Sequence, residues 1–295
     1  MDRVQTRLHV FGSACHLVVS GDKQLLERAT TELQRLERKF CYYQPDSVIN
    51  ALNQNAGTGI FTPLDAESRS LFDYTAALSD QSHHIFDPST RPLQNCYNKD
   101  GRLLATKQQL HNMLKLVDWS AIEITDRGAR LPRKGMLIDL NSCIRPYAVD
   151  CVRKLLLREG VKHALIEMER DAATIGKDAD GANWLIDLRH PLGLQAAIAR
   201  IKLNNQGYAM RGDYERRITL NGEFFSRALS PVDGQPIPGL LSVVVVADNC
   251  LAAAGAATVA RLKTEQAGIN WLNKLGLPWL AIDRQLVCHG PLFPC

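Results

Sequence analysis

Apolar residues recur along the chain in two rhythms, a helical one and an alternating one. Residues 22–40 carry apolar side chains at helical spacing with charges on the opposite face, which predicts an amphipathic helix. Residues 8–20 alternate apolar and polar positions around Gly12 and Ser13, which predicts two strands. Further helices are expected over residues 65–80, 107–116, 144–159, 250–262 and 265–275.

Strand-like runs fill much of the second half of the chain. The run from Leu241 to Val246 is rich in β-branched residues and predicts a buried strand. The other strands are expected around residues 120–139, at 163–167, 172–176, 184–189 and 195–203, in a β-rich stretch to about 220, and in a hairpin over 279–288. Because helices and strands interleave without a strict βαβ rhythm, the pattern favours an α+β domain over a doubly wound sheet.

Composition narrows the class of protein. The 295 residues are 45% apolar and 22% charged, with a net charge of +4, which is ordinary globular usage. No basic run with interleaved aromatic residues points to a nucleic-acid partner. No apolar run is long enough to span a membrane. The opening MDRVQTRLHV lacks the apolar stretch of a signal peptide, so a cytoplasmic location is expected unless an export signal has been removed. Eight scattered cysteines without a C-x-x-C pair indicate reduced thiols.

Several well-known catalytic loops are absent from the sequence. It has no G-x-G-x-x-G or Walker loop for a nucleotide and no G-x-S-x-G elbow. Instead, eight short motifs follow one another: FGS at 11–13, FCYYQPDSVINALN at 40–53, FDPSTRPL at 86–93, DLNSCIRPYAVD at 139–150, ERD at 169–171, WLID at 184–187, MRGDY at 210–214 and RALSPVDGQP at 227–236. In this order and spacing they resemble the flavin transferase (ApbE) family over nearly the whole chain.

The resemblance implies a fold, an activity and a binding site. The fold would be one α+β domain over residues 1–295, related to the T-fold, with mixed or antiparallel sheets packed by helices. The activity would be that of an FAD:protein FMN transferase, which moves FMN from FAD to a threonine or serine of a target flavoprotein. The residues that take the family's cofactor-binding positions are Gly12, Ser13, Tyr42, Ser47, Asp87, Arg145, Tyr147, Glu169, Asp171 and Arg211.

The metal position departs from the family pattern. In the family a late helix reads Ala-Asp-Ala-x-Ala-Thr, and its Asp and Thr hold a magnesium ion on the FAD phosphates, in keeping with the preference of magnesium for oxygen ligands. Here Thr258 takes the threonine place, Ile144 is the second metal position, and Ala254 stands where the aspartate would be. An alanine side chain offers no ligand atom, so no well-ordered magnesium is expected between this helix and Ile144. The run of alanines at 252–260 is expected to be a tight helix–sheet contact.

The catalytic positions depart as well. The family's histidine is replaced by Arg227, whose guanidinium stays protonated, and the threonine of the same motif is replaced by Asp233. No neutral base is then available at the histidine place, so FMN transfer is expected to be very slow or absent. Asp171 is the strongest remaining acidic candidate near the phosphates, whereas Asp139 and Asp150 are expected to hold backbone or cap positions.

Four arginines occupy motif positions where the family has lysine, glycine, serine and histidine: Arg145, Arg170, Arg211 and Arg227. In one interpretation their charge replaces the metal, and unpaired guanidiniums converge on an anionic nucleotide. In the other they are ordinary surface or ion-paired residues, and Arg170 fills space that a ligand needs. The usual exposure of arginine favours the second interpretation.

Two functional hypotheses therefore remain. The chain is either an FMN transferase or a degenerate homologue that binds FAD, another anionic nucleotide or a protein partner without magnesium-dependent transfer. The resemblance names the first, and the missing carboxylate and histidine favour the second.

Overall fold

The structure is a computed structural model that describes residues 3–98, 102–178, 180–190, 197–212, 218–220, 223–225 and 228–292. The strands are β1 (Arg3–Val10), β2 (Ser13–Ser20), β3 (Glu123–Thr125), β4 (Gly128–Arg130), β5 (Ala164–Met168), β6 (Asp171–Ile175), β7 (Trp184–Arg189), β8 (Ala197–Leu203), β9 (Gly207–Gly212), β10 (Ile218–Leu220), β11 (Glu223–Phe225), β12 (Ser242–Ala247), β13 (Trp279–Ile282) and β14 (Cys288–His289). The helices are α1 (Lys23–Phe40), α2 (Val48–Gln54), α3 (Ala66–Gln81), α4 (Lys107–Leu114), α5 (Asn141–Arg158), α6 (Cys250–Arg261) and α7 (Glu265–Leu275), with 3-10 turns η1 (Arg91–Cys96) and η2 (Trp119–Ala121).

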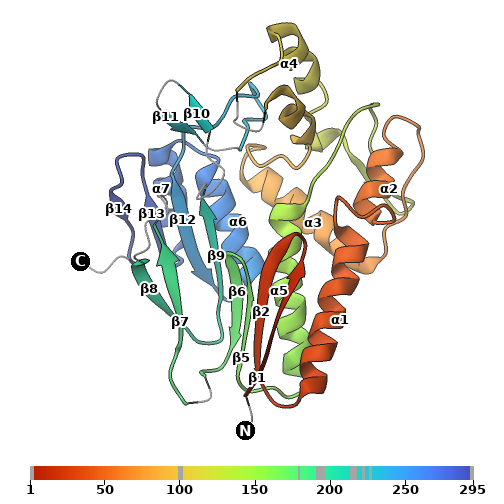
Figure 1. Cartoon of the computed structure of the whole chain (residues 1–295). Helices are drawn as coiled ribbons and strands as arrows, with labels where there is room; N and C mark the ends of the chain where they lie inside the picture. The colour runs from red at the N-terminus through yellow and green to blue at the C-terminus, as the bar shows by residue number, and fades with distance from the viewer. Residues whose placement is uncertain are drawn as a thin grey trace.

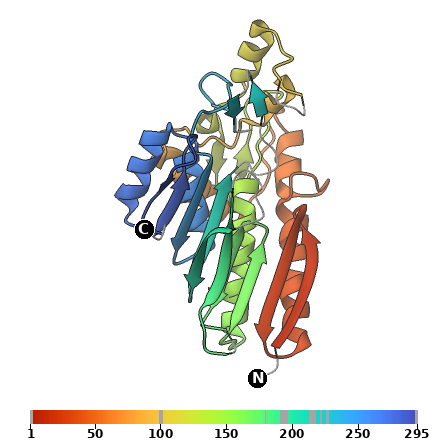
Figure 2. The same cartoon turned by 60° about the vertical axis from the view of Figure 1, so that its left-hand side comes forward.

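One large sheet organises the molecule. Among the described residues, eight strands pair in the order β1-β2-β5-β6-β9-β12-β13-β14, and each neighbouring pair is antiparallel. The N-terminal hairpin forms one end of the sheet and the C-terminal strands form the other (Figure 1). Figure 2 shows the long helices gathered along one face of the sheet. This antiparallel sheet with packed helices confirms the α+β prediction.

Alternation along the strands assigns side chains to the two faces. In β9, Tyr208 and Met210 pack in the cluster formed with the β7–β8 hairpin, whereas Ala209 packs with the alanines of α6. In β6, Ala172 faces the hairpin side and Ala173 faces the helices. Because successive side chains of a strand point to opposite faces, both faces of the central strands are buried. The same alternation directs the next odd-numbered side chains toward the helices, where the candidate site lies.

Most predicted elements are confirmed with small changes at their ends. The first helix begins after Asp22, whose carboxylate accepts a hydrogen bond from the N–H of Leu25 at 3.1 Å. Helix α5 begins at Asn141, three residues before the predicted start, and Gly160 follows its end with φ +79°. The sequence did not predict α2, which has only seven residues. No helix of the described ranges has the length and apolar character to cross a membrane.

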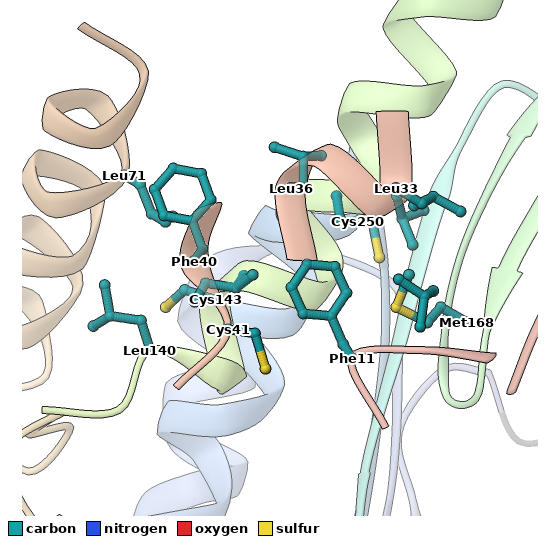
Figure 3. Close-up of a cluster of buried hydrophobic side chains, with 14 of the residues drawn as sticks. Phe11, Leu33, Leu36, Phe40, Cys41, Leu71, Leu140, Cys143, Met168 and Cys250 are labelled. Carbon is teal, nitrogen blue, oxygen red and sulfur yellow. The ribbon is translucent and has the colours of Figure 1, made fainter. Parts of the chain in front are cut away.

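The largest apolar cluster lies between the helices and the N-terminal half of the sheet. Figure 3 shows Leu33, Leu36 and Phe40 of α1 among side chains from α3, α5 and the strands. The rings of Phe40 and Tyr147 meet edge to face with centroids 6.3 Å apart. Cys143 and Cys250 are buried in the same cluster, and the cysteines of the described residues are free thiols. This cluster fixes α1 and α5 to the sheet.

The small residues of α6 let this helix approach the sheet closely. Ala253, Ala254 and Ala257 are fully buried against β9 and β12. A Cβ on Gly207 would lie 2.1 Å from the backbone nitrogen of Cys250, so only glycine fits at the start of β9. The predicted helix–sheet contact over 252–260 is therefore confirmed.

Asp150 holds the N-terminus of α6 from a neighbouring helix. Its buried carboxylate accepts hydrogen bonds from the backbone N–H groups of Cys250 at 2.9 Å and Leu251 at 2.8 Å. Asn249, the N-cap residue of α6, accepts another from Ala252 at 2.8 Å. The expected capping role of Asp150 is thus confirmed, across two helices that are distant in sequence.

A polar network joins the outer surfaces of α1, α3 and α5. Arg35 lies 2.8 Å from Glu32 and 2.7 Å from Glu67, and Lys39 lies 2.6 Å from Glu67. The hydroxyl of Tyr147 donates to Glu67 at 3.3 Å. The hydrogen bonds and charges of Arg35 and Lys39, with the Arg35 hydrogen bond the largest contribution, outweigh burial and lower the pKa of Glu67 from its usual 4.5 to about 2.

Removing the Asp150 carboxylate should destabilise the fold more than removing the ordinary cap. Asp150→Ala leaves two backbone donors at the start of α6 without acceptors, which should lower the free energy of unfolding by about 2–4 kcal/mol. Asn249→Ala removes one exposed cap and should lower it by about 1 kcal/mol. Urea denaturation of both variants measures the difference. Equal losses in the two variants would show that Asp150 acts only as a surface cap.

Replacing Glu67 should change the acid end of the stability profile. A carboxylate with a lowered pKa stabilises the fold above its unfolded pKa, and this contribution disappears as the pH falls from about 4.5 to about 2. Glu67→Gln should therefore lower the free energy of unfolding by about 1–2 kcal/mol at neutral pH, allowing for solvent screening. At a pH of about 2 the same substitution should leave the free energy of unfolding almost unchanged. Urea denaturation at several pH values across this range measures how the free energy of unfolding changes with pH. Glu27→Gln, at an exposed position, is the control. A pH-independent difference between wild type and Glu67→Gln would contradict the ionic role.

Candidate active site

The turns at residues 11–12 and 169–170 and the start of α5 lie close together. They lie at those ends of the strands that face α4 in Figure 1. The Ser13 hydroxyl donates to Glu169 at 2.8 Å, and Arg145 donates to the same carboxylate oxygen at 3.1 Å. Arg145 also donates to the carbonyl of Phe11 at 3.2 Å. The predicted cofactor residues Gly12, Ser13, Arg145 and Glu169 therefore lie together, but their polar atoms mostly bond one another.

Glu169 occupies an unusual backbone position. It opens the two-residue turn between Met168 and Asp171, which pair across β5 and β6, and its φ is +56°. Glycine adopts this left-handed region without steric penalty, whereas a glutamate there is strained by roughly 1 kcal/mol or more. The motif that this turn resembles has glycine at position 169. In this conformation the carboxylate of Glu169 accepts hydrogen bonds from both Ser13 and Arg145.

A second polar cluster surrounds Arg211 at the end of β9. Its Nη1 donates to Asp171 Oδ1 at 2.6 Å and to the carbonyl of Met210 at 3.1 Å. Its Nη2 lies 3.4 Å from Asp171 Oδ2 and 3.5 Å from the carbonyl of Ser142. Its Nε donates to Thr258 Oγ1 at 3.3 Å. One guanidinium therefore connects β6, β9, α5 and α6.

Strand register explains why these side chains meet. Asp171 of β6 pairs with Ala209 of β9, so Arg211 is its diagonal neighbour on the helix-facing side of the sheet. Diagonal neighbours are about 7–8 Å apart at their Cα atoms, which a long arginine side chain spans easily. The side chain of Asp171 is only 5% exposed and that of Arg211 17%, so the pair lies largely out of water.

Burial and charge act in opposite directions on this ion pair. Burial raises the pKa of Asp171, and the charge and hydrogen bonds of Arg211 oppose that rise. Burial lowers the pKa of Arg211, but the charge and hydrogen bond of Asp171 outweigh it and raise the pKa overall. The pair is ionised, because a guanidinium stays protonated and a carboxylate held by charge-assisted bonds favours its charged form.

A small hollow lies beside the Arg211 cluster. Its volume is about 160 Å³, and its lining comes from Ile85, Phe86, Asp87, Pro88, Thr90, Gln94, Asp139, Ser142, Ala228, Leu229, Thr258 and Leu262. Ligand pockets usually exceed about 300 Å³, so the hollow has room for one ring or phosphate group rather than a whole dinucleotide. A larger hollow of about 550 Å³ lies at the opposite end of the sheet, beside Gly21 and Gly160. None of the motif residues lines that larger hollow, so the smaller one is the candidate site.

The two carboxylates that line the candidate hollow are engaged by their own loops. Asp87 accepts from the backbone and hydroxyl of Ser89 at 2.7 and 2.5 Å and from the backbone of Trp119 at 3.1 Å. Asp139 accepts from the backbone of Asn141 at 3.0 Å and lies 3.6 Å from Arg91. Asp87 and Asp139 therefore organise the loops around the hollow, as expected for Asp139.

An aromatic and cationic surface adjoins the hollow. The guanidinium of Arg91 lies over the ring of Tyr42 at 4.6 Å and donates to the hydroxyl of Tyr43 at 3.1 Å. Arg91 also donates to Gln94, which lines the hollow, at 2.7 Å. Tyr43 is 68% exposed. Tyr42 is thus the predicted aromatic residue that lies near the candidate site.

Other predicted residues lie elsewhere or are differently engaged. Ser47 is fully buried and caps α2 by accepting from Asn50 at 3.0 Å. Tyr147 belongs to the polar network of Glu67. Ile144 is 1% exposed and packs in the apolar core. Asp233 accepts from the backbone of Gln235 at 3.0 Å in a surface turn. The predicted catalytic residue Arg227 lies outside the described residues.

The idea of unpaired converging arginines is wrong for Arg145 and Arg211. Arg145 lies 3.1 Å from Glu169 and Arg211 lies 2.6 Å from Asp171, so each has its own carboxylate. Arg170 donates to the carbonyl of Gly212 at 2.6 Å and lies along the end of β9. Arg227 is not among the described residues. Arg145 and Arg211 are therefore ion-paired, as the alternative interpretation held for them, and neither is left unpaired to converge on a ligand.

The residues at the family's metal position do not fit a magnesium ion. Ala254 is fully buried and has only a methyl group, and Thr258 bonds the guanidinium of Arg211. Magnesium requires several oxygen ligands in near-octahedral geometry. Here only the Thr258 hydroxyl is available, and it already accepts a hydrogen bond from Arg211. Within the described part of the chain, Glu32, Glu67 and Cys151 form the one group of three His, Cys, Asp or Glu side chains close enough to share a metal ion, but Arg35 already pairs with both carboxylates.

Sequence reasoning missed two contributors to the site. Arg91 was read only as part of a motif, and its contact with Tyr42 depends on the fold. The carbonyl of Ser142 is free of the usual helical bond because Pro146, four residues later, has no N–H. Pro146 sits inside α5, so a proline four residues after a motif serine was a signal that could have identified this free acceptor.

Comparisons with known proteins agree with the motifs and the fold. A model of the ApbE family matches residues 11–280. The FAD:protein FMN transferase of Haemophilus influenzae is 26% identical over 280 residues, which cover 90% of this chain and 80% of that protein. The protein of the same name from Vibrio cholerae is 21% identical over 272 residues, covering 90% and 81%.

Solved structures share the fold. The ApbE protein of Thermotoga maritima superposes with a TM-score of 0.87 at 22% identity and covers 98% of this chain and 97% of its own. The apo flavinyl transferase ApbE of Pseudomonas stutzeri superposes with a TM-score of 0.87 at 24% identity, covering 100% and 98%. Family model, motif order and fold together identify this chain as a member of the ApbE family.

Proposed function

We propose that this chain recognises FAD at the hollow beside Arg211 and catalyses magnesium-dependent FMN transfer very slowly or not at all. Flavin recognition is supported by membership of the ApbE family, whose curated relatives are named FAD:protein FMN transferases. Weak transfer is supported by the chemistry of the residues at the site. The location expected for such a protein from its sequence is the cytoplasm.

One observation carries the proposal. The Thr258 hydroxyl, at the family's metal-ligand position, bonds Arg211 Nε at 3.3 Å. One turn earlier, the buried Ala254 has no carboxylate to offer. In a family reaction, a metal ion would stabilise the charge that develops on the leaving phosphate. A chain without ligands for that ion loses this stabilisation, and each 1.36 kcal/mol lost slows the step about tenfold.

The site retains groups that suit a nucleotide. Thr90, Ser142 and Thr258 are among the residues that line the hollow, and the Tyr42 ring with its Arg91 partner lies beside it. Aromatic rings and guanidinium groups both stack on flat heteroaromatic rings. The volume of about 160 Å³ suits one such ring or a phosphate, so FAD would bind partly outside the hollow.

A second candidate function is FMN transfer itself. It is favoured by the shared name of the relatives that span most of this chain, and the acceptor would be a threonine or serine of a target flavoprotein. In that case the chemistry would proceed without the family's histidine and aspartate. The same experiment separates the two candidates.

Binding and transfer should respond differently to FAD. Titration of the protein with FAD, followed by flavin fluorescence, should show saturable binding that is unchanged by millimolar magnesium. Tyr42→Ala should weaken binding by roughly 1–2 kcal/mol, as expected for the loss of one stacking partner. Phe61→Ala is the matched control, because it removes a different aromatic ring that packs against guanidinium groups, at 4.0 Å from Arg127 and 4.8 Å from Arg130, and that does not line the hollow. No saturable binding with or without magnesium would refute flavin recognition.

Transfer is tested with a family acceptor protein, FAD and magnesium. The Haemophilus influenzae relative serves as the positive control, and intact-mass spectrometry of the acceptor is the readout. We expect at most a trace of FMN-modified acceptor with this chain under conditions in which the control modifies it fully. Stoichiometric, magnesium-dependent modification by this chain would establish the second candidate and overturn the first.

A further inference from the structure

The guanidinium of Arg211 has a complete set of oxygen partners. A guanidinium has five N–H donors, and Arg211 directs its three nitrogens to Asp171, Thr258 and the carbonyls of Met210 and Ser142. The bond to Ser142 at 3.5 Å is at the long limit, and the bond to Asp171 at 2.6 Å is the shortest. The cluster is therefore a cage of oxygen atoms around one cation.

The chemical nature of these oxygens is significant. A carboxylate, a hydroxyl and a backbone carbonyl are the hard ligands that Mg²⁺, Mn²⁺ or Ca²⁺ takes in proteins. Pro146 contributes by leaving the Ser142 carbonyl without its usual donor within α5. We propose that the Arg211 guanidinium permanently replaces a divalent cation here, and that its removal turns Asp171, Thr258 and the Ser142 carbonyl into a divalent-cation site.

Charge balance supports the replacement. The cage has one carboxylate, that of Asp171, which neutralises one guanidinium but only half the charge of a divalent ion. Ala254 lies one helical turn before Thr258 on α6, where a second carboxylate would neutralise such an ion. Arg211 and Ala254 therefore complement each other, because a cage with one carboxylate balances a guanidinium and a cage with two would balance a divalent ion. This inference needs no nucleotide, so its test is independent of the proposed function.

The test measures thermal stability with and without millimolar Mn²⁺. In the wild type, Mn²⁺ should leave the Tm unchanged, because Arg211 holds the oxygens. Arg211→Ser should lower the Tm by about 10 °C, since it leaves a buried carboxylate unpaired. Mn²⁺ should then restore several degrees of that loss, because a ligand that binds only the folded state stabilises it. Arg211→Lys keeps a cation in the cage and should respond to Mn²⁺ no more than the wild type.

Two double variants complete the test. Asp171→Asn with Arg211→Ser removes the carboxylate and should abolish the response to Mn²⁺, which excludes binding elsewhere on the surface. Ala254→Asp with Arg211→Ser adds the second carboxylate and should bind Mn²⁺ at least about tenfold more tightly than Arg211→Ser alone. If Arg211→Ser does not fold without metal, the Ala254→Asp, Arg211→Ser variant provides the test instead. It should then fold only when Mn²⁺ is present.

Electron paramagnetic resonance of free Mn²⁺ gives the affinities and the outcome that overturns the proposal. One Mn²⁺ bound by the wild type and lost in Asp171→Asn would show that Arg211 does not replace a metal. Folded Arg211→Ser protein that ignores Mn²⁺, together with an Ala254→Asp, Arg211→Ser protein that also ignores it, would refute the latent site.

Discussion

The register between β6 and β9 is the constraint on which the site depends. It pairs Asp171 with Ala209 and so puts Arg211 within reach of the carboxylate on the helix side. A shift of β9 by one residue would turn Arg211 to the other face of the sheet, away from Asp171. Gly207 fixes this register from the other end of β9, because only a residue without a side chain lets α6 approach there. The position of Thr258 on α6 follows from the same close contact.

The two arginines of the site are each balanced by a carboxylate. Asp171 with Arg211, and Glu169 with Arg145, form two paired units along one end of the sheet. An exchangeable metal ion allows a site to open, load and empty, whereas a guanidinium is tethered to its own strand. Replacement of the former by the latter gives up adjustable chemistry for a fixed connection among four elements. Such an exchange agrees with the slow or absent FMN transfer that we propose for this chain.

Sequence patterns predicted most of the fold because they report local burial. The stripe that includes Leu33, Leu36 and Phe40 gave α1 almost to the residue, and the β-branched run gave β12. The seven residues of α2 are too few for a clear period, and α5 begins without a side-chain cap that could mark its start. Those two boundaries therefore needed tertiary contacts.

The candidate site was predicted less completely than the fold. Motif order correctly gathered Ser13, Arg145 and Glu169 in one place, because each motif lies at the same end of its element. It could not say which carboxylate each arginine would choose, since Asp171 and Arg211 are joined by a strand pairing rather than by local spacing. Ser47 shows the opposite limit, because a motif serine turned out to be a buried helix cap.

The strand order also has a consequence for how the chain reaches its native state. The N-terminal hairpin does not pair with the next strands along the chain, since β2 pairs with β5, where Cys15 lies opposite Met168. During synthesis the bonding edge of β2 is complete long before its partner is made. Contacts between such distant segments carry a large loop-closure entropy and fold slowly. Until β5 arrives, the edge of β2 that will pair with it stays open, because α1 covers only the face that carries Leu17 and Val19.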